Sequence, residues 1–173
     1  MTARPPAVVG LDLSLTGTGI AQADGSTTTV RTRASAGDRR LLTIALAVRD
    51  AVSITDGVDL VVIEDLPKHA MAAGITGMVH GVARAVLLET GTPYVTVAPA
   101  TLKAYATGKG SGDKTAMALA AFKRAGAEFA DDNQCDAWWL RAAGLDRLGA
   151  PLFGLPAAQR DRLDRVAWPE VSR

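Results

Sequence analysis

Residues 8–21 read VVGLDLSLTGTGIA and predict a buried strand, a tight turn and a second strand. The first strand is apolar at almost every position, which is typical of a strand covered on both faces of a sheet. Gly17 and Gly19 would permit the turn. Asp12 stands near the end of the apolar run, where a carboxylate costs free energy unless a cation meets it. We therefore interpret Asp12 as a functional residue, the alternative being an ordinary strand-end residue that caps the turn.

The rest of the chain predicts an α/β fold. A hairpin signal at residues 24–26 adds a third strand, so three antiparallel strands open the chain. A helix then leads to an apolar run that ends at Glu64, and a connection of this length predicts parallel pairing with the first strand. We expect strands at residues 7–13, 19–23, 27–32, 58–64 and 94–97, and helices at about 38–53, 71–90, from Pro99, 114–126 and 132–147. The expected fold is a five-stranded mixed sheet flanked by helices.

Length and composition are those of one globular domain. The chain has 173 residues and 48% hydrophobic residues, enough for a real core but too few for two large lobes. Pro151 and Pro156 predict that the domain spans residues 1–155 and that residues 156–173 form a loosely attached helical tail, either an additional binding arm or disordered. Cys135 is the single cysteine, so we expect a small buried side chain and neither a disulfide nor a cysteine metal cluster.

Charge and hydropathy exclude few partners. A net charge of +1 neither indicates nor excludes nucleic-acid binding, because a local basic patch could bind nucleic acid. No run of about eighteen apolar residues predicts a membrane span, and residues 1–6 lead straight into a short strand without a signal-peptide core. We therefore expect a cytoplasmic protein without a membrane partner.

Three further acids could converge on Asp12, namely Glu64, Asp132 and Asp136. Carboxylates gathered at one point repel one another, and magnesium with its preference for oxygen ligands is the usual remedy. This pattern predicts a metal-dependent phosphoryl-transfer site. Each acid also has an ordinary interpretation: Glu64 as a solvated strand end, Asp132 as a helix N-cap, and Asp136 as a first-turn acid favoured by the helix dipole.

Several separated motifs together resemble the ribonuclease H-like superfamily, and within it the RuvC-type Holliday junction resolvases of the compact kind found in phages and actinobacteria. The resemblance spans roughly residues 7–147. It rests on GLDLS at 10–14 with TGTG at 16–19, on VVIE at 61–64, on Lys103 and Lys114, and on DNQCDAWWL at 132–140. The sequence departs from the family in that Asn133, not an acid, lies three residues before Asp136, so either Asp132 or Asn133 could complete the site.

The resemblance implies a structure-selective DNA endonuclease that resolves Holliday junctions symmetrically as a homodimer. Two Mg²⁺ ions, for which Mn²⁺ would substitute, would clamp the attacking and leaving oxygens during hydrolysis, and no organic cofactor is expected. The implied metal ligands are Asp12, Glu64, Asp132 and Asp136, with Lys114 stabilising the transition state. The expected DNA-binding residues are Lys103, Lys109, Lys68, Lys123 and Arg124. The protein would then act in the cytoplasm of a bacterial or phage-infected cell.

Some alternatives stay open. Residues 71–90 carry Gly74, Gly77 and Gly81 at helical spacing and are the candidate dimer surface, although a plain core helix fits the pattern equally well. The loop at 65–71 lacks the aromatic residue that the family often stacks on a junction base, and no cleavage-site preference is predicted. A general branched-DNA or flap nuclease of the same fold, an actin-like or sugar-kinase-like ATPase, and an inactive nucleic-acid scaffold are the rival functions. Nuclease assays and ATP turnover distinguish them.

Overall fold

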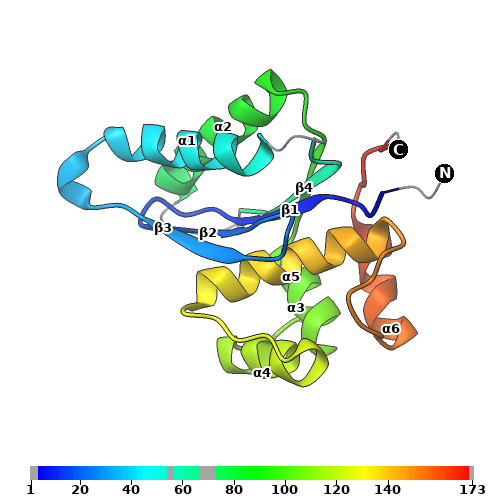
Figure 1. Cartoon of the computed structure of the whole chain (residues 1–173). Coiled ribbons are helices and arrows are strands. Elements are labelled where there is room, and N and C mark those ends of the chain that lie inside the picture. Colours follow the sequence, from blue (N-terminus) through cyan, green and yellow to red (C-terminus); the bar gives the residue numbers. More distant parts are fainter. Residues whose placement is uncertain (1–3, 54–56, 67–72, 172–173) are drawn as a thin grey trace.

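The computed structural model describes residues 4–53, 57–66 and 73–171. A mixed sheet crosses the middle of the molecule with helices on both faces (Figure 1). Its strands are β1 (Val8–Asp12), β2 (Gly17–Ala21), β3 (Thr27–Arg31), β4 (Leu60–Glu64) and β5 (Tyr94–Val97), in the order β3-β2-β1-β4-β5. β2 runs antiparallel to β1 and β3, whereas β4 is parallel to β1 and to β5. The predicted five-stranded mixed sheet with three antiparallel opening strands is confirmed.

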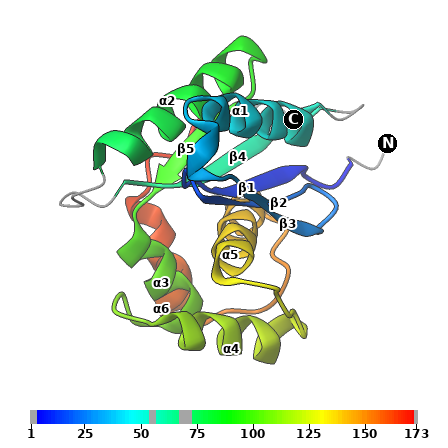
Figure 2. The same cartoon turned by 90° about the vertical axis from the view of Figure 1, so that its left-hand side faces the viewer.

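The helices form two unequal layers. They are α1 (Arg39–Val52), α2 (Ala73–Glu89), α3 (Pro99–Thr107), α4 (Lys114–Ala125), α5 (Asp132–Arg147) and α6 (Ala157–Arg160), with 3-10 turns at Ala34–Ala36 and Asp161–Arg165. α1 and α2 cover one face of the sheet, and α5 lies flat against the other, with α3, α4 and α6 outside it (Figures 1 and 2). Among the described helices, none is long and apolar enough to cross a membrane.

Glycines bring α5 unusually close to the sheet. A Cβ atom at Gly10 would lie 2.0 Å from the carbonyl oxygen of Ala137, and one at Gly19 would lie 2.0 Å from that of Asn133. Neither Gly17 nor Gly19 has a positive φ, and both belong to β2, not to the turn before it. The turn role predicted for these two glycines was therefore wrong: the missing side chain of Gly19 makes room for the α5 backbone, and Gly17 lies against the side chain of Asn133.

The core has one part on each side of the sheet. Toward α1 and α2 it is aliphatic, with Leu11 and Ile63 fully buried. Toward α5 it is aromatic, because Trp138 and Trp139 pack against one another and Tyr105 of α3 meets Trp139 edge-on at 5.9 Å between ring centroids. Trp138 and Trp139 both belong to this core. The burial predicted for Cys135 is confirmed.

The C-terminal segment is part of this core. Gln159 and Leu163 are only 7% and 5% exposed, and Trp168 packs on the same cluster. The Gln159 side-chain amide donates to the carbonyl oxygen of Tyr105 at 2.8 Å, and Arg160 pairs with the carboxylate of Asp146. The described part of the tail predicted at 156–173 packs against α3 and α5, and it supplies the cation that Asp146 of α5 requires.

Candidate active site

Two acids meet at one edge of the sheet because their strands are parallel. Asp12 is the last residue of β1 and Glu64 is the last residue of β4, and the register pairs Leu11 with Ile63 one position earlier. The carboxyl ends of neighbouring parallel strands lie side by side at the strand spacing of roughly 4.8 Å. The sheet therefore brings Asp12 and Glu64 together, as their sequence positions predicted.

Helix α5 adds Asp136 to this edge. It passes over Gly19 at Asn133 and over Gly10 at Ala137, and Asp136 lies between these two points of contact. Because Gly19 is the register partner of Asp12, Asp136 comes close enough for its charge to raise the pKa of both Asp12 and Glu64. Three acids from β1, β4 and α5 thus share one region.

These three carboxyl groups are partly buried, and their surroundings raise the pKa of each. Burial first and the charge of Asp136 second raise the pKa of Asp12 to about 7. Burial, followed by the charges of Asp12 and Asp136, raises the pKa of Glu64 to about 8. Burial and the neighbouring Asp132 raise the pKa of Asp136 to about 6. In the described part of the chain, no hydrogen bond or ion pair involves any of these three side chains. A site that gathers acids in this way favours a cationic ligand.

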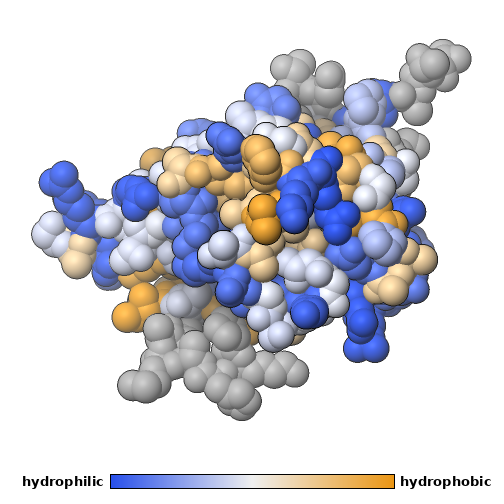
Figure 3. All heavy atoms as spheres, turned by 90° about the horizontal axis from the view of Figure 1, so that it is seen from below, coloured by the Kyte–Doolittle hydropathy of each residue, from blue (hydrophilic) through white to orange (hydrophobic). Residues whose placement is uncertain are grey.

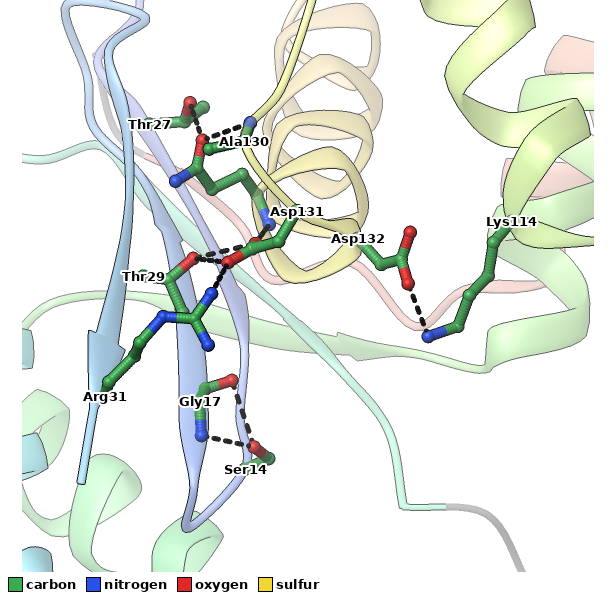
Figure 4. Close-up of polar contacts among 10 residues, drawn as sticks. Ser14, Gly17, Thr27, Thr29, Arg31, Lys114, Ala130, Asp131 and Asp132 are labelled. Carbon is green, nitrogen blue, oxygen red and sulfur yellow. Dashed lines mark hydrogen bonds and ion pairs between the residues drawn. The ribbon is translucent and has the colours of Figure 1, made fainter. Parts of the chain in front are cut away.

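Two of the predicted lysines lie beside the carboxylates. Lys114 is the first residue of α4, and its Nζ donates to Asp132 at 2.6 Å (Figure 4). Its positive charge also lowers the pKa of Asp12 and Asp136. Lys103 of α3 is half-buried and lowers the pKa of Glu64 and Asp136. The site is therefore an acidic centre bordered by two cations.

The other predicted DNA-binding residues lie elsewhere. Lys109 is exposed in the turn between α3 and α4. Lys123 and Arg124 belong to the last turn of α4, roughly 14 Å from Lys114 at 1.5 Å per helical residue. The guanidinium of Arg124 donates to Gln159 at 3.2 Å, a contact with the C-terminal segment. Lys68 lies outside the described residues.

Asp131, which the sequence interpretation passed over, is the N-cap of α5. Its carboxylate accepts from the backbone N–H of Gln134 at 3.1 Å, from the hydroxyl of Thr29 at 2.8 Å and from the Nη2 of Arg31 at 2.7 Å (Figure 4). The interpretation of Asp132 as the cap is therefore excluded. The spacing of Asp131 and Gln134 could have identified it, because an acceptor followed three residues later by Gln or Glu is a capping signal, and the Gln134 amide oxygen does accept from the N–H of Ala130.

Asn133, the alternative to Asp132, faces the sheet. Its carbonyl oxygen and Cβ lie over Gly19, and its Nδ2 lies 3.1 Å from where a Cβ at Gly17 would be. Asp132 has the carboxylate that a metal prefers, but in this structure it pairs with Lys114. The choice between the two residues stays a prediction.

An apolar groove of about 600 Å³ lies between α4 and the start of α5. Its lining includes Leu119, Phe122 and Phe129, and it reaches Asp131 and Asp132. The view from below shows orange apolar atoms among blue hydrophilic ones on the side where α4 lies (Figure 3). Leu119 and Phe122 are 49% and 53% exposed. Their spacing of three residues is typical of a core-facing stripe, so the sequence offers no sign that this face is open.

The donor set fits a hard divalent cation in its chemistry. The ligands on offer are carboxylate oxygens, which Mg²⁺ and Mn²⁺ prefer, and in the part of the chain that the structure describes these oxygens have no hydrogen-bond or ion-pair partner. Within the described residues, however, no group of three or more His, Cys, Asp or Glu side chains is arranged as a ready ligand cluster. The carboxylates thus fit magnesium by type, charge and burial, and their precise coordination is not preformed.

The fold is similar to that of solved RuvC structures. The chain superposes on the Thermus thermophilus RuvC structure with a TM-score of 0.66 and 21% identity, over 83% of this chain and 96% of that one. It superposes on T. thermophilus RuvC in complex with Holliday junction substrate with a TM-score of 0.67, the same identity and the same coverage. No protein-family model and no curated protein matches the sequence. The predicted fold resemblance is confirmed by structure alone.

Proposed function

We propose that the protein is a divalent-metal-dependent endonuclease that resolves Holliday junctions. The observation that carries the proposal is the convergence of Asp12, Glu64 and Asp136, buried and without partners among the described residues, at one sheet edge of a RuvC-like fold. A scaffold without catalytic activity would have no use for three carboxylates whose repulsion costs stability. The solved complex of a neighbour with a Holliday junction supports branched DNA as the substrate.

The carboxylates would hold the metal. Asp12, Glu64 and Asp136 would be ligands, with Asp132 or Asn133 completing the set. Bound magnesium would supply a water of lowered pKa and would neutralise the leaving oxygen. The protein's own contribution is to exclude bulk water from the acids by burying them under α5, which strengthens their interaction with any cation.

The flanking lysines would act on the phosphate. The Lys114 side chain is 74% exposed and lies beside the acids. Its ammonium group would leave Asp132 and stabilise the negative charge that develops on the scissile phosphate. Lys103 is half-buried and lies close enough to lower the pKa of Glu64 and Asp136, and it would orient the neighbouring phosphate. Lys109 lies further out and would add a salt-sensitive contact that carries no sequence information.

Symmetric cleavage of a four-way junction requires two sites related by a twofold axis. α2 offers a surface for a second copy, because Ile75, Met78 and Leu88 are 51%, 46% and 71% exposed. A Cβ at Gly74, Gly77 or Gly81 would meet nothing within 4 Å, so a partner backbone could approach there. We propose that the homodimer forms through this face, and light scattering coupled to size-exclusion chromatography would measure its mass.

The test compares the unmodified protein with Asp12→Asn on four-way, forked, flapped and linear DNA, with Mg²⁺, Mn²⁺ or EDTA. We expect paired nicks in the four-way junction with either metal, none with EDTA, and a loss of roughly 10²–10³-fold or more in rate for the variant. Equal cutting of forks and flaps would favour a general branched-DNA nuclease. Absence of metal-dependent cutting of every branched substrate, or ATP turnover in its place, would refute the proposal.

A further inference from the structure

Strand direction brings one unassigned cation to the edge of the sheet that holds the acids. β3 is antiparallel to β2, which is antiparallel to β1, so β3 runs in the same direction as β1 and β4. Arg31 is the last residue of β3, as Asp12 and Glu64 are the last of β1 and β4. Two strand spacings, roughly 10 Å, separate the line of β3 from that of β1. Arg31 therefore stands on the flank of the carboxylates opposite to Lys103.

The Arg31 side chain is held in place but still open to solvent. Its Nη2 contacts the Oδ2 of Asp131 at 2.7 Å, and the Asp131 carboxylate is fixed in turn by Thr29 and by the N–H of Gln134. The side chain of Arg31 is 71% exposed, whereas that of Asp131 is 18% exposed. A guanidinium has five N–H donors, so this contact leaves donors directed to solvent beside the site.

Two consecutive acids thus direct two cations to opposite sides. Asp131 points toward Arg31 of β3, and Asp132 points toward Lys114 of α4 (Figure 4). The charge of Asp131 reaches Asp12 strongly enough to contribute to its raised pKa, so the Arg31 side of this arrangement lies within electrostatic range of the candidate metal site. Cations border the acids on the α3 and α4 side and also on the β3 side.

We propose that Arg31 binds a backbone phosphate of the DNA strand on the β3 side of the active site and, with Lys114 on the opposite side, sets the path of that strand across the carboxylates. This inference rests on the proposed nuclease function and extends it to a residue outside the predicted binding set. One strand carries a phosphate for roughly every 3.4 Å of helix axis, so Arg31 faces phosphates only a few nucleotides from the one cut. A guanidinium forms bidentate contacts with phosphate.

The competing interpretation is that Arg31 only steadies the N-cap of α5. The salt dependence of binding separates the two roles, because a lost phosphate contact lowers the slope of log K against log salt concentration by roughly 0.9, whereas a loosened cap does not. Arg31→Lys keeps the charge and Arg31→Gln removes it. Arg49→Gln is the matched control, since Arg49 also forms an exposed ion pair, with Glu89, on the α1 and α2 side of the sheet.

The experiment measures binding to a four-way junction in Ca²⁺, over a range of salt concentrations, and cleavage in Mg²⁺. We expect Arg31→Gln to bind about 5- to 10-fold more weakly with a slope reduced by roughly 0.9, Arg31→Lys to restore the slope, and Arg49→Gln to match the unmodified protein. If Arg31→Gln keeps the full slope while the unmodified protein binds and cuts junctions, the inference fails and the nuclease proposal stands. If the unmodified protein neither binds nor cuts branched DNA, both fail.

Discussion

Helix α5 carries an acid near each of its ends, with Asp146 buried and Asp136 partly buried, and the surroundings of the two acids differ. Asp146, near the C-terminal end, has a side chain only 4% exposed and is fully partnered: Arg160 pairs with it and the hydroxyl of Tyr105 donates to it at 3.2 Å. Asp136, near the N-terminal end, has no such partner among the described residues, and its pKa rises to about 6. Burial is common to both, so burial alone does not mark the functional acid.

The two acids differ in which part of the chain supplies a positive charge to them. The C-terminal segment brings Arg160 to Asp146, and the result is a closed structural contact between α5, α3 and α6. At the other end, Asp136 faces Asp12 and Glu64, and the nearest cations stay partly in solvent on the flanks. A protein retains uncompensated buried charge at a cost in stability, and such sites cluster where ligands or substrates bind. The contrast supports the N-terminal end of α5 as part of the proposed site.

The pH dependence of stability gives the largest expected effect. Glu64, Asp12 and Asp136 bind a proton more tightly in the folded chain than in the unfolded one, with pKa values raised to about 8, 7 and 6. Their contribution is complete below about pH 4 and is lost as pH rises through 6 to 8, so the free energy of unfolding in EDTA should fall by several kcal/mol between pH 5 and pH 9.

Urea denaturation at each pH measures this fall. Glu64→Gln should flatten the profile, because it removes the group with the highest raised pKa. His80, whose pKa is lowered by burial, contributes with the opposite sign near pH 6, and comparison of the variant with the unmodified protein at the same pH cancels it. A free energy of unfolding that is constant or rises from pH 5 to pH 9 would contradict the picture of uncompensated acids.

Matched amide substitutions at the two ends of α5 should have opposite effects on stability. Asp146→Asn weakens the charged contacts to Arg160 and to buried Tyr105, and should lower the free energy of unfolding by about 2 kcal/mol. Asp136→Asn removes a repulsive charge and should leave stability at pH 8 unchanged or higher. Denaturation at pH 8 in EDTA measures both, with cleavage assayed in parallel. A larger loss for Asp136→Asn than for Asp146→Asn would reverse the assignment of the two ends.

The exposed pair between Lys114 and Asp132 should have the smallest effect on stability. Their side chains are 74% and 52% exposed, and exposed ion pairs typically contribute below about 1 kcal/mol. The free energy of unfolding of Lys114→Gln should therefore lie within about 1 kcal/mol of that of the unmodified protein. The variant should nevertheless cleave junctions far more slowly. A cleavage rate equal to that of the unmodified protein would remove Lys114 from the proposed mechanism. Its contact with Asp132 would then be only an exposed surface ion pair.

Local patterns predicted most of the molecule. Apolar runs, helix periodicity and the length of the strand–helix–strand connection were sufficient for the sheet and its mixed strand directions, and parallel pairing then placed Glu64 beside Asp12. The burial of Cys135 was predicted from its being the single, small cysteine of the chain. Resemblance of separated motifs added the lysines of the site, and the structure places Lys103 and Lys114 there.

What the local patterns missed depends on contacts between distant parts of the chain. A glycine that permits a turn and a glycine that admits a helix backbone look the same in sequence, so the function of Gly19 depended on where α5 lies. Asp131 and Asp132 are equally good caps by type, and the hydroxyl of Thr29 and the guanidinium of Arg31 on β3 distinguish them. The sequence of the C-terminal segment gives no sign of its attachment, which depends on the ion pair between Arg160 and the buried Asp146.

The amino-acid sequence by itself determined which segments are strands and helices and which acids stand at strand and helix ends, because hydrophobic burial and strand pairing follow short-range spacing. Only the tertiary structure decided which of those charges are neutralised. Partners such as Arg160 for Asp146 and Arg31 for Asp131 come from elements far along the chain, and the free energy of a buried charge depends on what lies against it in space.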